Sequence, residues 1–354
     1  LYRVKSPTGG ELPVLFLDTD IPGNLAEDRK ITDHLYGGDK SYRLKQEIVL
    51  GIGGARLLQI LGFRVRKYHL NEGHASLLTL ELLNHHRLSV EDTWDERASW
   101  DTRRVQDKCV FTTHTPVEAG HDRFPYELVE RIMGEVIPTD LLQELGGKDE
   151  LNMTMLALNL SHFVNGVAKK HGEVSQALFP GFEIHAITNG IHPFTWGSPY
   201  MMTLFDKYLP GWANEPELLV RVDIIPDAEI QDAHAGAKAY LFQYIEEVAG
   251  VKFDPELLTI GFARRATAYK RANMIFSDPA LLKKIGNGKL QLVFAGKAHP
   301  QDDHGKKMIQ EIRKQTEFFG DDLKIVYLPN YNIDVASRLI PGVDIWLNTP
   351  QRPL

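Results

Sequence analysis

Residues Leu257–Ala272 read LLTIGFARRATAYKRA, and this stretch decides the fold of the last third of the chain. It begins with a continuous apolar run and passes directly into a cluster of cationic side chains. A short continuous apolar run predicts a strand buried on both faces, which is typical of parallel sheets covered by helices. Similar runs follow in KLQLVFAGKA (Lys289–Ala298), DLKIVYLPN (Asp322–Asn330) and VDIWLNTP (Val343–Pro350).

Helical patterns separate these runs. They are YKRANMIFSDPALLKKI (Tyr269–Ile285), the amphipathic DDHGKKMIQEIRKQTEFFG (Asp302–Gly320) and IDVASRLI (Ile333–Ile340). Parallel strands joined by helices form right-handed crossovers, so this alternation predicts a Rossmann-like layer.

The first half of the chain shows the same alternation of expected strands and helices, but less clearly. We expect strands at LPVLFLDTD (Leu12–Asp20), RVRKYHLN (Arg64–Asn71), CVFTTHTP (Cys109–Pro116) and EIHAITN (Glu183–Asn189). We expect helices at Ser41–Gly62, His74–His86 and Leu151–Gly172. The fold class is therefore α/β, with two Rossmann-like domains at residues 1–190 and 191–354 that face each other across a ligand cleft. Their boundary is expected near Asn189–Pro193.

Composition narrows the class of protein. The chain has 354 residues, with 40 Lys and Arg against 47 Asp and Glu, and a net charge of −7. A nucleic-acid binder usually carries a basic surplus, so we expect no nucleic-acid partner. We find no apolar run of membrane-spanning length and no signal pattern, although the first residue is Leu1 rather than methionine. Cys109 is the single cysteine, which fits a reducing compartment, so we expect a cytoplasmic enzyme.

The cationic cluster after the first apolar run is the strongest chemical signal. Lys270 and Arg271 are expected inside the start of a helix, where the macrodipole disfavours cations. A bound anion at that position would offset this cost, so we favour anion binding over a solvated charged turn. FAGKAHP (Phe294–Pro300) repeats the arrangement one strand later, with Lys297 at the strand end.

Two motifs of the first half also follow expected strands. In NEGHASL (Asn71–Leu77), Glu72 and His74 at a strand-to-helix turn suit a binding site, and helix capping by Asn71 and Glu72 is the competing interpretation. In FTTHTPVEAGHDRF (Phe111–Phe124), the residue before a proline is held extended, which would fix His114 at the sheet edge. A buried structural histidine is the competing interpretation.

Two further patterns are set aside. GIGGA (Gly51–Ala55) lacks a preceding strand and has Arg56 at the place of the third glycine of a nucleotide-binding loop, so we interpret its glycines as helix-packing residues. The fourteen histidines form no HExxH or Cys/His pattern, and we expect no metal site.

Seven segments in order resemble the α-glucan (glycogen and maltodextrin) phosphorylases, the shorter bacterial or archaeal type rather than the regulated animal enzymes. They are RLKQEIVLGIGG, YHLNEGHASL, FTTHTPVEAGHDRF, AITNGIHPFTW, TIGFARRATAYKRANMIF, VFAGKAHPQDDHGK and LPNYNIDVASRLIPGVDIWLNTP, and the resemblance covers essentially the whole chain. It implies the GT-B arrangement of two facing domains, a sugar-binding side in residues 1–190 and a phosphate side in residues 191–354.

The resemblance implies phosphorolysis of an α-1,4-glucan by inorganic phosphate, which releases glucose 1-phosphate with retention. Pyridoxal phosphate would act through its 5′-phosphate as a proton relay. Arg265 and Lys270 look like the phosphate-binding pair, and Arg264 stands where some members place a lysine beside the cofactor phosphate. The resemblance also suggests a homodimer.

Further site residues follow from the same resemblance. Tyr269, His114 and Asn189 resemble residues that border or hydrogen-bond the glucose, with Glu72 and His74 behind it. Trp196 and Tyr331 resemble neighbours of the pyridoxal ring, and Lys297 lies in the family's Gly-Lys turn.

Two family elements are missing from these residues, namely the first glycine-rich loop and the glycine-rich segment with the Schiff-base lysine. We therefore expect both domains to be incomplete, and we expect these 354 residues alone neither to hold pyridoxal phosphate covalently nor to turn over. Two rival hypotheses are a GT-B glycosyltransferase that uses a nucleotide sugar and a non-catalytic glucan-binding protein of the same fold.

Overall fold

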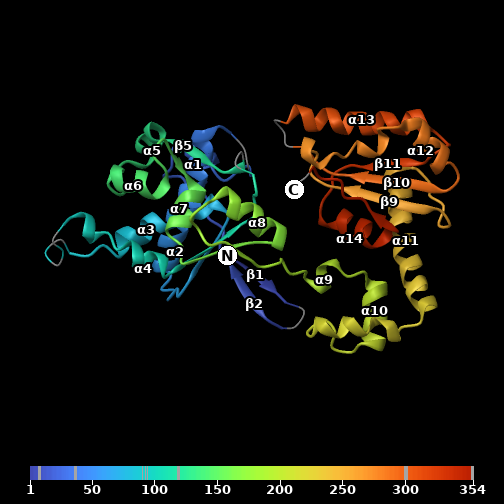
Figure 1. Ribbon diagram of the computed structural model, residues 1–354, viewed down its shortest axis with the longest axis horizontal. Coiled ribbons are helices and arrows are strands. Elements are labelled where there is room, and N and C mark those ends of the chain that lie inside the picture. The colour runs from blue at the N-terminus through green and yellow to red at the C-terminus, as the bar shows by residue number, and fades with distance from the viewer. Residues whose placement is uncertain are drawn as a thin grey trace. The chain divides into compact units, whose positions relative to one another are not determined.

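A computed structural model describes residues 1–6, 9–35, 38–89, 91, 93, 95–117, 120–298 and 302–351. The chain has a mixed α/β structure with parallel sheets, and it divides into two compact units, Leu1–Asn189 and Gly190–Leu354 (Figure 1). Each unit is described by itself. Among the helices of the described residues, none has the length and apolar character needed to cross a membrane.

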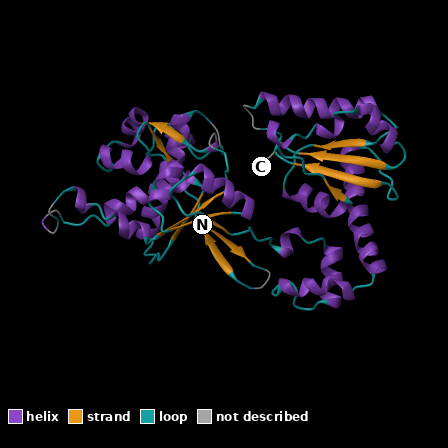
Figure 2. Ribbon diagram, in the orientation of Figure 1, coloured by secondary structure: helices purple, strands orange, loops and turns teal. Residues whose placement is uncertain are grey.

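The second unit contains a parallel sheet in the order β11-β10-β9-β12 (Figure 2). Its strands are β9 (Leu258–Ala263), β10 (Leu290–Ala295), β11 (Ile325–Leu328) and β12 (Ile345–Trp346). All four expected strands are confirmed. The order is 3-2-1-4 in chain sequence, as in Rossmann sheets, and it reverses between β9 and β12. Ligands bind at the carboxyl ends of strands beside such a reversal.

Helices cover both faces of this sheet. On one side α11 (Asp227–Ala249) and α14 (Ile333–Gly342) contact each other, and Val293 of β10 belongs to their apolar cluster. The next residue, Phe294, belongs to the opposite cluster, to which α12 (Pro279–Gly286) and α13 (Asp303–Phe319) contribute. Neighbouring strand residues point to opposite faces, so a continuous apolar run fills both layers.

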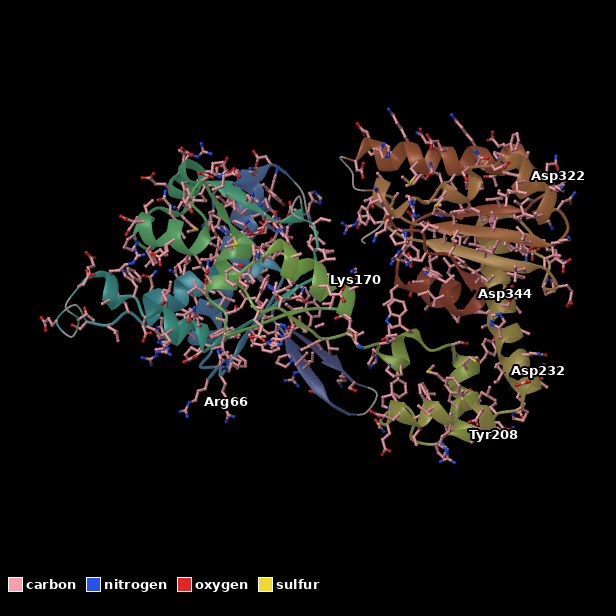
Figure 3. The ribbon with its side chains drawn as sticks, in the orientation of Figure 1. Arg66, Lys170, Tyr208, Asp232, Asp322 and Asp344 are labelled. Atoms are coloured by element: carbon pink, nitrogen blue, oxygen red, sulfur yellow. The ribbon has the colours of Figure 1, made fainter. Side chains whose placement is uncertain are left out.

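An ion pair ties β12 to α11. Asp344, labelled in Figure 3, accepts hydrogen bonds from buried Lys238 Nζ at 2.9 Å and from Thr259 N at 2.7 Å. Although burial opposes it, the hydrogen bond from Lys238 helps to hold the pKa of Asp344 below its usual value. Before α11, the helices α9 (Pro193–Trp196), α10 (Pro199–Tyr208) and the 3-10 segment Pro216–Ile224 lead into the sheet.

The helix expected over Tyr269–Ile285 is wrong in its first half. The chain forms a 3-10 turn at Ala268–Lys270, passes through Arg271 in the left-handed region (φ 49°, ψ 48°), and turns again at Met274–Phe276. Only α12 forms an α-helix in this stretch. Asp278 caps it by accepting a hydrogen bond from Leu281 N. Lys270 therefore lies in a short 3-10 turn, and the expected helix macrodipole does not act on it.

The first unit contains a parallel sheet in the order β3-β4-β7-β8. Its strands are β3 (Tyr68–Asn71), β4 (Cys109–Thr113), β7 (Phe163–Gly166) and β8 (His185–Ala186). The surrounding helices are α1 (Lys40–Ile48), α2 (Gly54–Ile60), α3 (Leu78–His85), α4 (Thr102–Gln106), α5 (Tyr126–Met133), α6 (Thr139–Gly146), α7 (Met153–Asn159) and α8 (Lys169–Leu178). A short hairpin pairs β5 (Arg123–Pro125) with β6 (Glu150–Asn152).

Two expectations for this unit are wrong. The stretch Leu12–Asp20 adds no strand to the sheet, since only β2 (Glu11–Val14) is extended and it pairs antiparallel with β1 (Tyr2–Lys5). The helix expected over Leu151–Gly172 is broken by β7, whose buried FVNG run is too short to show a strand pattern between two helices.

Among the glycines of Gly51–Ala55, Gly51 is a packing residue, as the sequence indicated. Gly51 and Gly53 lie in a π-helical segment, Val49–Gly53, between α1 and α2, and Gly54 begins α2. A Cβ on Gly51 would lie 2.8 Å from Leu78 N at the start of α3, so the close approach of these helices requires glycine.

Candidate functional site

Glu72 stands at the carboxyl end of β3 with an unusual backbone, φ 64° and ψ 178°. This conformation is rare outside glycine and is found where the surrounding structure enforces it. The side chain is 9% exposed, and its Oε1 accepts hydrogen bonds from His114 N and, at 2.9 Å, from Thr115 Oγ1. Glu72 therefore does not cap the following turn, and instead ties the end of β3 to the chain after β4.

This contact orients His114. Its ring Nε2 lies 2.8 Å from Asn71 Oδ1, so both the backbone and the ring are anchored at the sheet edge. The structure thus brings together His114 and Glu72. The third sugar-side residue, Asn189, is exposed after β8, and its backbone N donates to Val167 O at 3.1 Å.

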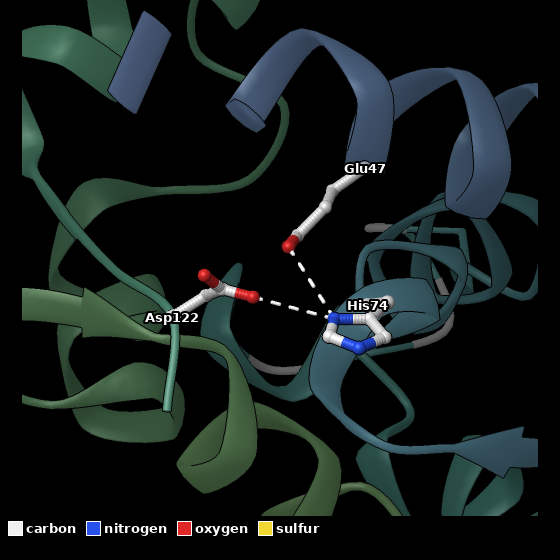
Figure 4. A group of neighbouring side chains, drawn as sticks. All are labelled: Glu47, His74 and Asp122. Atoms are coloured by element: carbon white, nitrogen blue, oxygen red, sulfur yellow. Dashed lines mark ion pairs between the residues drawn. The ribbon is translucent and has the colours of Figure 1, made fainter. Parts of the chain in front are cut away.

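His74 lies in a cluster of ionisable groups on a different set of elements (Figure 4). Its Nδ1 is 2.6 Å from Arg43 Nη2, 3.3 Å from Asp122 Oδ2 and 3.8 Å from Glu47 Oε1. Arg43 also contacts both acids, with Nη2 2.9 Å from Asp122 Oδ2 and Nε 3.1 Å from Glu47 Oε1. The guanidinium of Arg43 therefore lies against two acidic side chains and an imidazole.

Burial and hydrogen bonding shift the pKa values of this cluster in opposite directions. Burial raises the pKa of Glu47 to about 8. Hydrogen bonds to Asp122 and then to Glu47 raise the pKa of His74 to about 9. Burial of Asp122 works against ionisation, but hydrogen bonds from His74, Glu47 and Arg43 hold its pKa well below the usual range. These shifts favour the protonated forms of His74 and Glu47 and the ionised form of Asp122.

Glu47, His74 and Asp122 also have the atom types and spacing of metal ligands, with ligand atoms within 4.8 Å of one another. Arg43 already supplies the positive charge that a metal would bring. We therefore propose no metal here.

The cationic stretch of the second unit forms a loop after β9, at the reversal of strand order. Arg264 Nη2 donates to Asn348 Oδ1, at the end of β12, over 2.9 Å. The Nε of Arg264 is buried and has no hydrogen-bond partner among the described residues. Such a donor is costly to bury unpaired, and an anion would satisfy it.

Arg271 holds this loop in place. Its Nε donates to Thr349 O at 2.8 Å and its Nη2 to Pro350 O at 2.9 Å, while Thr349 Oγ1 donates back to Lys270 O at 3.1 Å. Lys270 Nζ lies 4.4 Å from the centre of the Tyr269 ring, a cation–π contact. Arg265 is exposed.

The three remaining candidates also lie in the second unit. Lys297 follows β10, and its carbonyl accepts from Ala266 N at 3.0 Å, which links the two strand-end loops. Tyr331 is half-buried against the core, and burial raises its pKa while the charge of Arg264 opposes this. Trp196 is 38% exposed on α9, a helix that contacts α14.

Sequence reasoning missed several of these contacts. The Arg43–Glu47 spacing of four residues in a helix signals an ion pair but gives no hint of the histidine it meets. Asn348 follows an expected strand, so its position was a usable signal. The role of Arg271 as a clamp depends on its left-handed backbone, which no local pattern indicated.

Comparison with known proteins identifies the protein family of this chain. A family model of carbohydrate phosphorylases matches residues 139–348, which is more than half of the chain. The chain belongs to the carbohydrate phosphorylase family, as the seven motifs predicted.

Individual relatives are phosphorylases of glucans. The chain is 36% identical over 377 residues to maltodextrin phosphorylase of Thermococcus litoralis, covering 98% of this chain and 45% of that protein. It is 36% identical over 398 residues to glycogen phosphorylase of Mycobacterium tuberculosis, with coverages of 98% and 45%, and 35% identical over 389 residues to that of Aquifex aeolicus, with coverages of 98% and 55%. The chain spans about half the length of these curated relatives.

Proposed function

We propose that the protein catalyses phosphorolysis of α-1,4-glucans, releasing glucose 1-phosphate with retention of the anomer. The observation that carries the proposal is the cationic loop Arg264–Arg271, held at the reversal of strand order in a phosphorylase-family sheet. Glycogen and maltodextrin phosphorylases among the relatives support the choice of substrate.

The loop suits a site for two phosphate groups. At about 4 Å and an effective dielectric near 20, each pair of unit negative charges repels by about 4 kcal/mol. Fixed guanidinium and ammonium groups offset that repulsion most effectively where water is excluded. In this proposal Arg265 and Lys270 bind the substrate phosphate, and the buried Nε of Arg264 faces an anion.

The sugar side of the proposal rests on the first unit. Glu72 fixes His114 through its backbone N–H, so the imidazole is presented without rotational freedom. Hydrogen-bonding groups on a rigid frame suit the hydroxyls of a glucose residue. Asn189 and Tyr269 would add further hydrogen bonds to the same sugar.

The residues also fit pyridoxal phosphate. Arg264 offers an unpaired buried donor for the phosphate group. Tyr331 and Trp196 would lie beside the pyridoxal ring, and Lys297 would lie in the turn next to the ring. When bound, the cofactor would supply a phosphate group able to act as a proton relay. The residues of this chain would hold the two phosphate groups and orient the sugar for proton transfer.

The GT-B fold class belongs to the same proposal, with the sugar-binding residues in one domain and the phosphate-binding residues in the other. The assembly proposed is a homodimer.

Product analysis tests the activity. The full-length protein, supplied with pyridoxal phosphate, maltodextrin and inorganic phosphate, should form α-glucose 1-phosphate without any nucleotide sugar. Product formation only with a nucleotide sugar would favour the glycosyltransferase rival. Glucan binding that is unaffected by phosphate and by Lys270→Ala, with no product, would favour the non-catalytic rival.

A further inference from the structure

A second cationic site lies in the second unit, in a cavity of about 750 Å³ at the carboxyl ends of β10 and β11. The ends of these strands supply Gly296, Lys297 and Ala298 on one side and Tyr327, Pro329 and Asn330 on the other. The last turn of α11 and one face of α13 complete it, through Val248, Ala249, Lys306, Ile309 and Arg313. The volume falls within the range of small-molecule pockets.

The charge of this cavity is one-sided. Lys306, Ile309 and Arg313 are three and four residues apart on α13, so they share one stripe of the helix. Lys297 joins them from the end of β10, and no carboxylate is among the described lining residues. Lys306 pairs with Asp303 at 3.0 Å, a residue outside the lining, while Lys297 and Arg313 have no ion pair with any described residue. The cavity thus keeps unbalanced positive charge.

Tyr327 makes the cavity floor rigid. Its hydroxyl donates to Gly296 O at 2.9 Å, which ties the chain after β10 to β11. Gly296 itself admits no side chain, since a Cβ there would lie 2.2 Å from Arg264 O. Burial raises the pKa of Tyr327 to about 12, so its ring stays a neutral wall.

Part of the lining is an apolar wall, formed by Val248 and Ala249 of α11 together with Pro329. We propose that this cavity binds a small organic phosphate, with the phosphate group on Lys297, Lys306 and Arg313 and the organic part against the apolar wall. Three cations suit a doubly charged phosphate, and the planar guanidinium of Arg313 can bind two of its oxygens. The cavity shares Lys297 with the proposed cofactor site, but Arg264, Arg265 and Lys270 do not line it, so the proposal goes beyond phosphorolysis.

Calorimetric titration with phenyl phosphate tests the proposal. We expect saturable binding to the protein that weakens at least tenfold in Arg313→Gln and in Lys306→Gln. Lys307→Gln is the matched control, since Lys307 is the neighbouring exposed lysine of α13 and does not line the cavity. Inorganic phosphate should bind this site more weakly, and phenol should not bind it.

Arg265→Gln separates this site from the proposed substrate-phosphate site. Binding that Arg265→Gln retains and Arg313→Gln weakens supports the second site, whether or not the protein phosphorolyses glucans. The proposal is overturned if phenyl phosphate does not bind, or if its affinity falls in Arg265→Gln and is unchanged in Arg313→Gln. Urea unfolding of each variant identifies any loss of binding that comes from misfolding, and a misfolded Arg313→Gln is replaced by Lys306→Gln.

Discussion

Glu72 has both a structural role and a role in the proposed chemistry. Its backbone lies in a region that glycine tolerates far better, yet its carboxylate holds His114 N and Thr115 Oγ1. Strain of this kind persists where the side chain contributes more than the backbone costs. The sequence placed Glu72 and His114 at two strand ends, but it gave no means to predict that one holds the other.

Glu72→Ala should lower stability by about 1–3 kcal/mol, because the His114 N–H then loses its acceptor. The initial rate of phosphorolysis should fall by much more than the loss of folded protein explains, because the imidazole of His114 is no longer fixed. Initial rates and urea unfolding measure the two effects. Glu81→Ala is the control, since Glu81 is an equally buried carboxylate that binds Arg56 away from the strand ends. Equal loss of activity in both variants would contradict the assignment.

The cluster around His74 predicts a dependence of stability on pH. The pKa of His74 is raised from 6.5 to about 9 in the folded state, so its contribution is complete below about pH 6.5 and is lost as the pH rises through 9. The raised pKa of Glu47 acts in the same direction between about 4.5 and 8. Stability should therefore decline from pH 6.5 to 9.5.

His74→Gln should flatten this decline, by on the order of 2 kcal/mol between those pH values. Urea midpoints of wild type and variant at pH 6.5, 8 and 9.5 measure it. His34→Gln, an exposed histidine, should leave the slope unchanged. A slope in His74→Gln as steep as in wild type would contradict the role of this imidazole.

At the scale of elements, all four strands of the second sheet were predicted, and so were β3, β4 and β8 of the first sheet. Continuous apolar runs between helices identified all four strands of the second sheet, because burial on both faces leaves a clear signal. The strand β7 was hidden, since FVNG is short and lies between two helical patterns. The cationic loop was predicted as a helix because its hydrophobic spacing is helical, while Arg271 and the residues after β12 impose turns.

Gly296→Ala tests the contact between the two strand-end loops. A Cβ would meet Arg264 O at 2.2 Å and Gly296 has φ 150°, so we expect a loss of more than about 2 kcal/mol in stability. Gly288→Ala is the control, because Gly288 has φ 64° but no atom within 4 Å of an added Cβ. It should cost only about 1–2 kcal/mol, the strain of the backbone alone. Equal costs measured by urea unfolding would contradict the close approach.

At the scale of the molecule, each unit has its own core and its own half of the candidate residues. The unit Leu1–Asn189 contains Glu72, His74, His114 and Asn189. The unit Gly190–Leu354 contains the cationic loop Arg264–Arg271. In our proposal the first group binds the sugar and the second binds phosphate. The family could be predicted from the order of the seven motifs, because that order reflects the whole chain rather than any single element.

The dependence of the initial rate on phosphate concentration tests the central claim most directly. In the full-length protein with pyridoxal phosphate and saturating maltodextrin, Arg265→Gln should lower kcat/KM for phosphate by about a hundredfold or more, equivalent to about 3 kcal/mol. Lys307→Gln should leave it unchanged. A phosphate dependence that is the same in Arg265→Gln as in wild type would contradict the account.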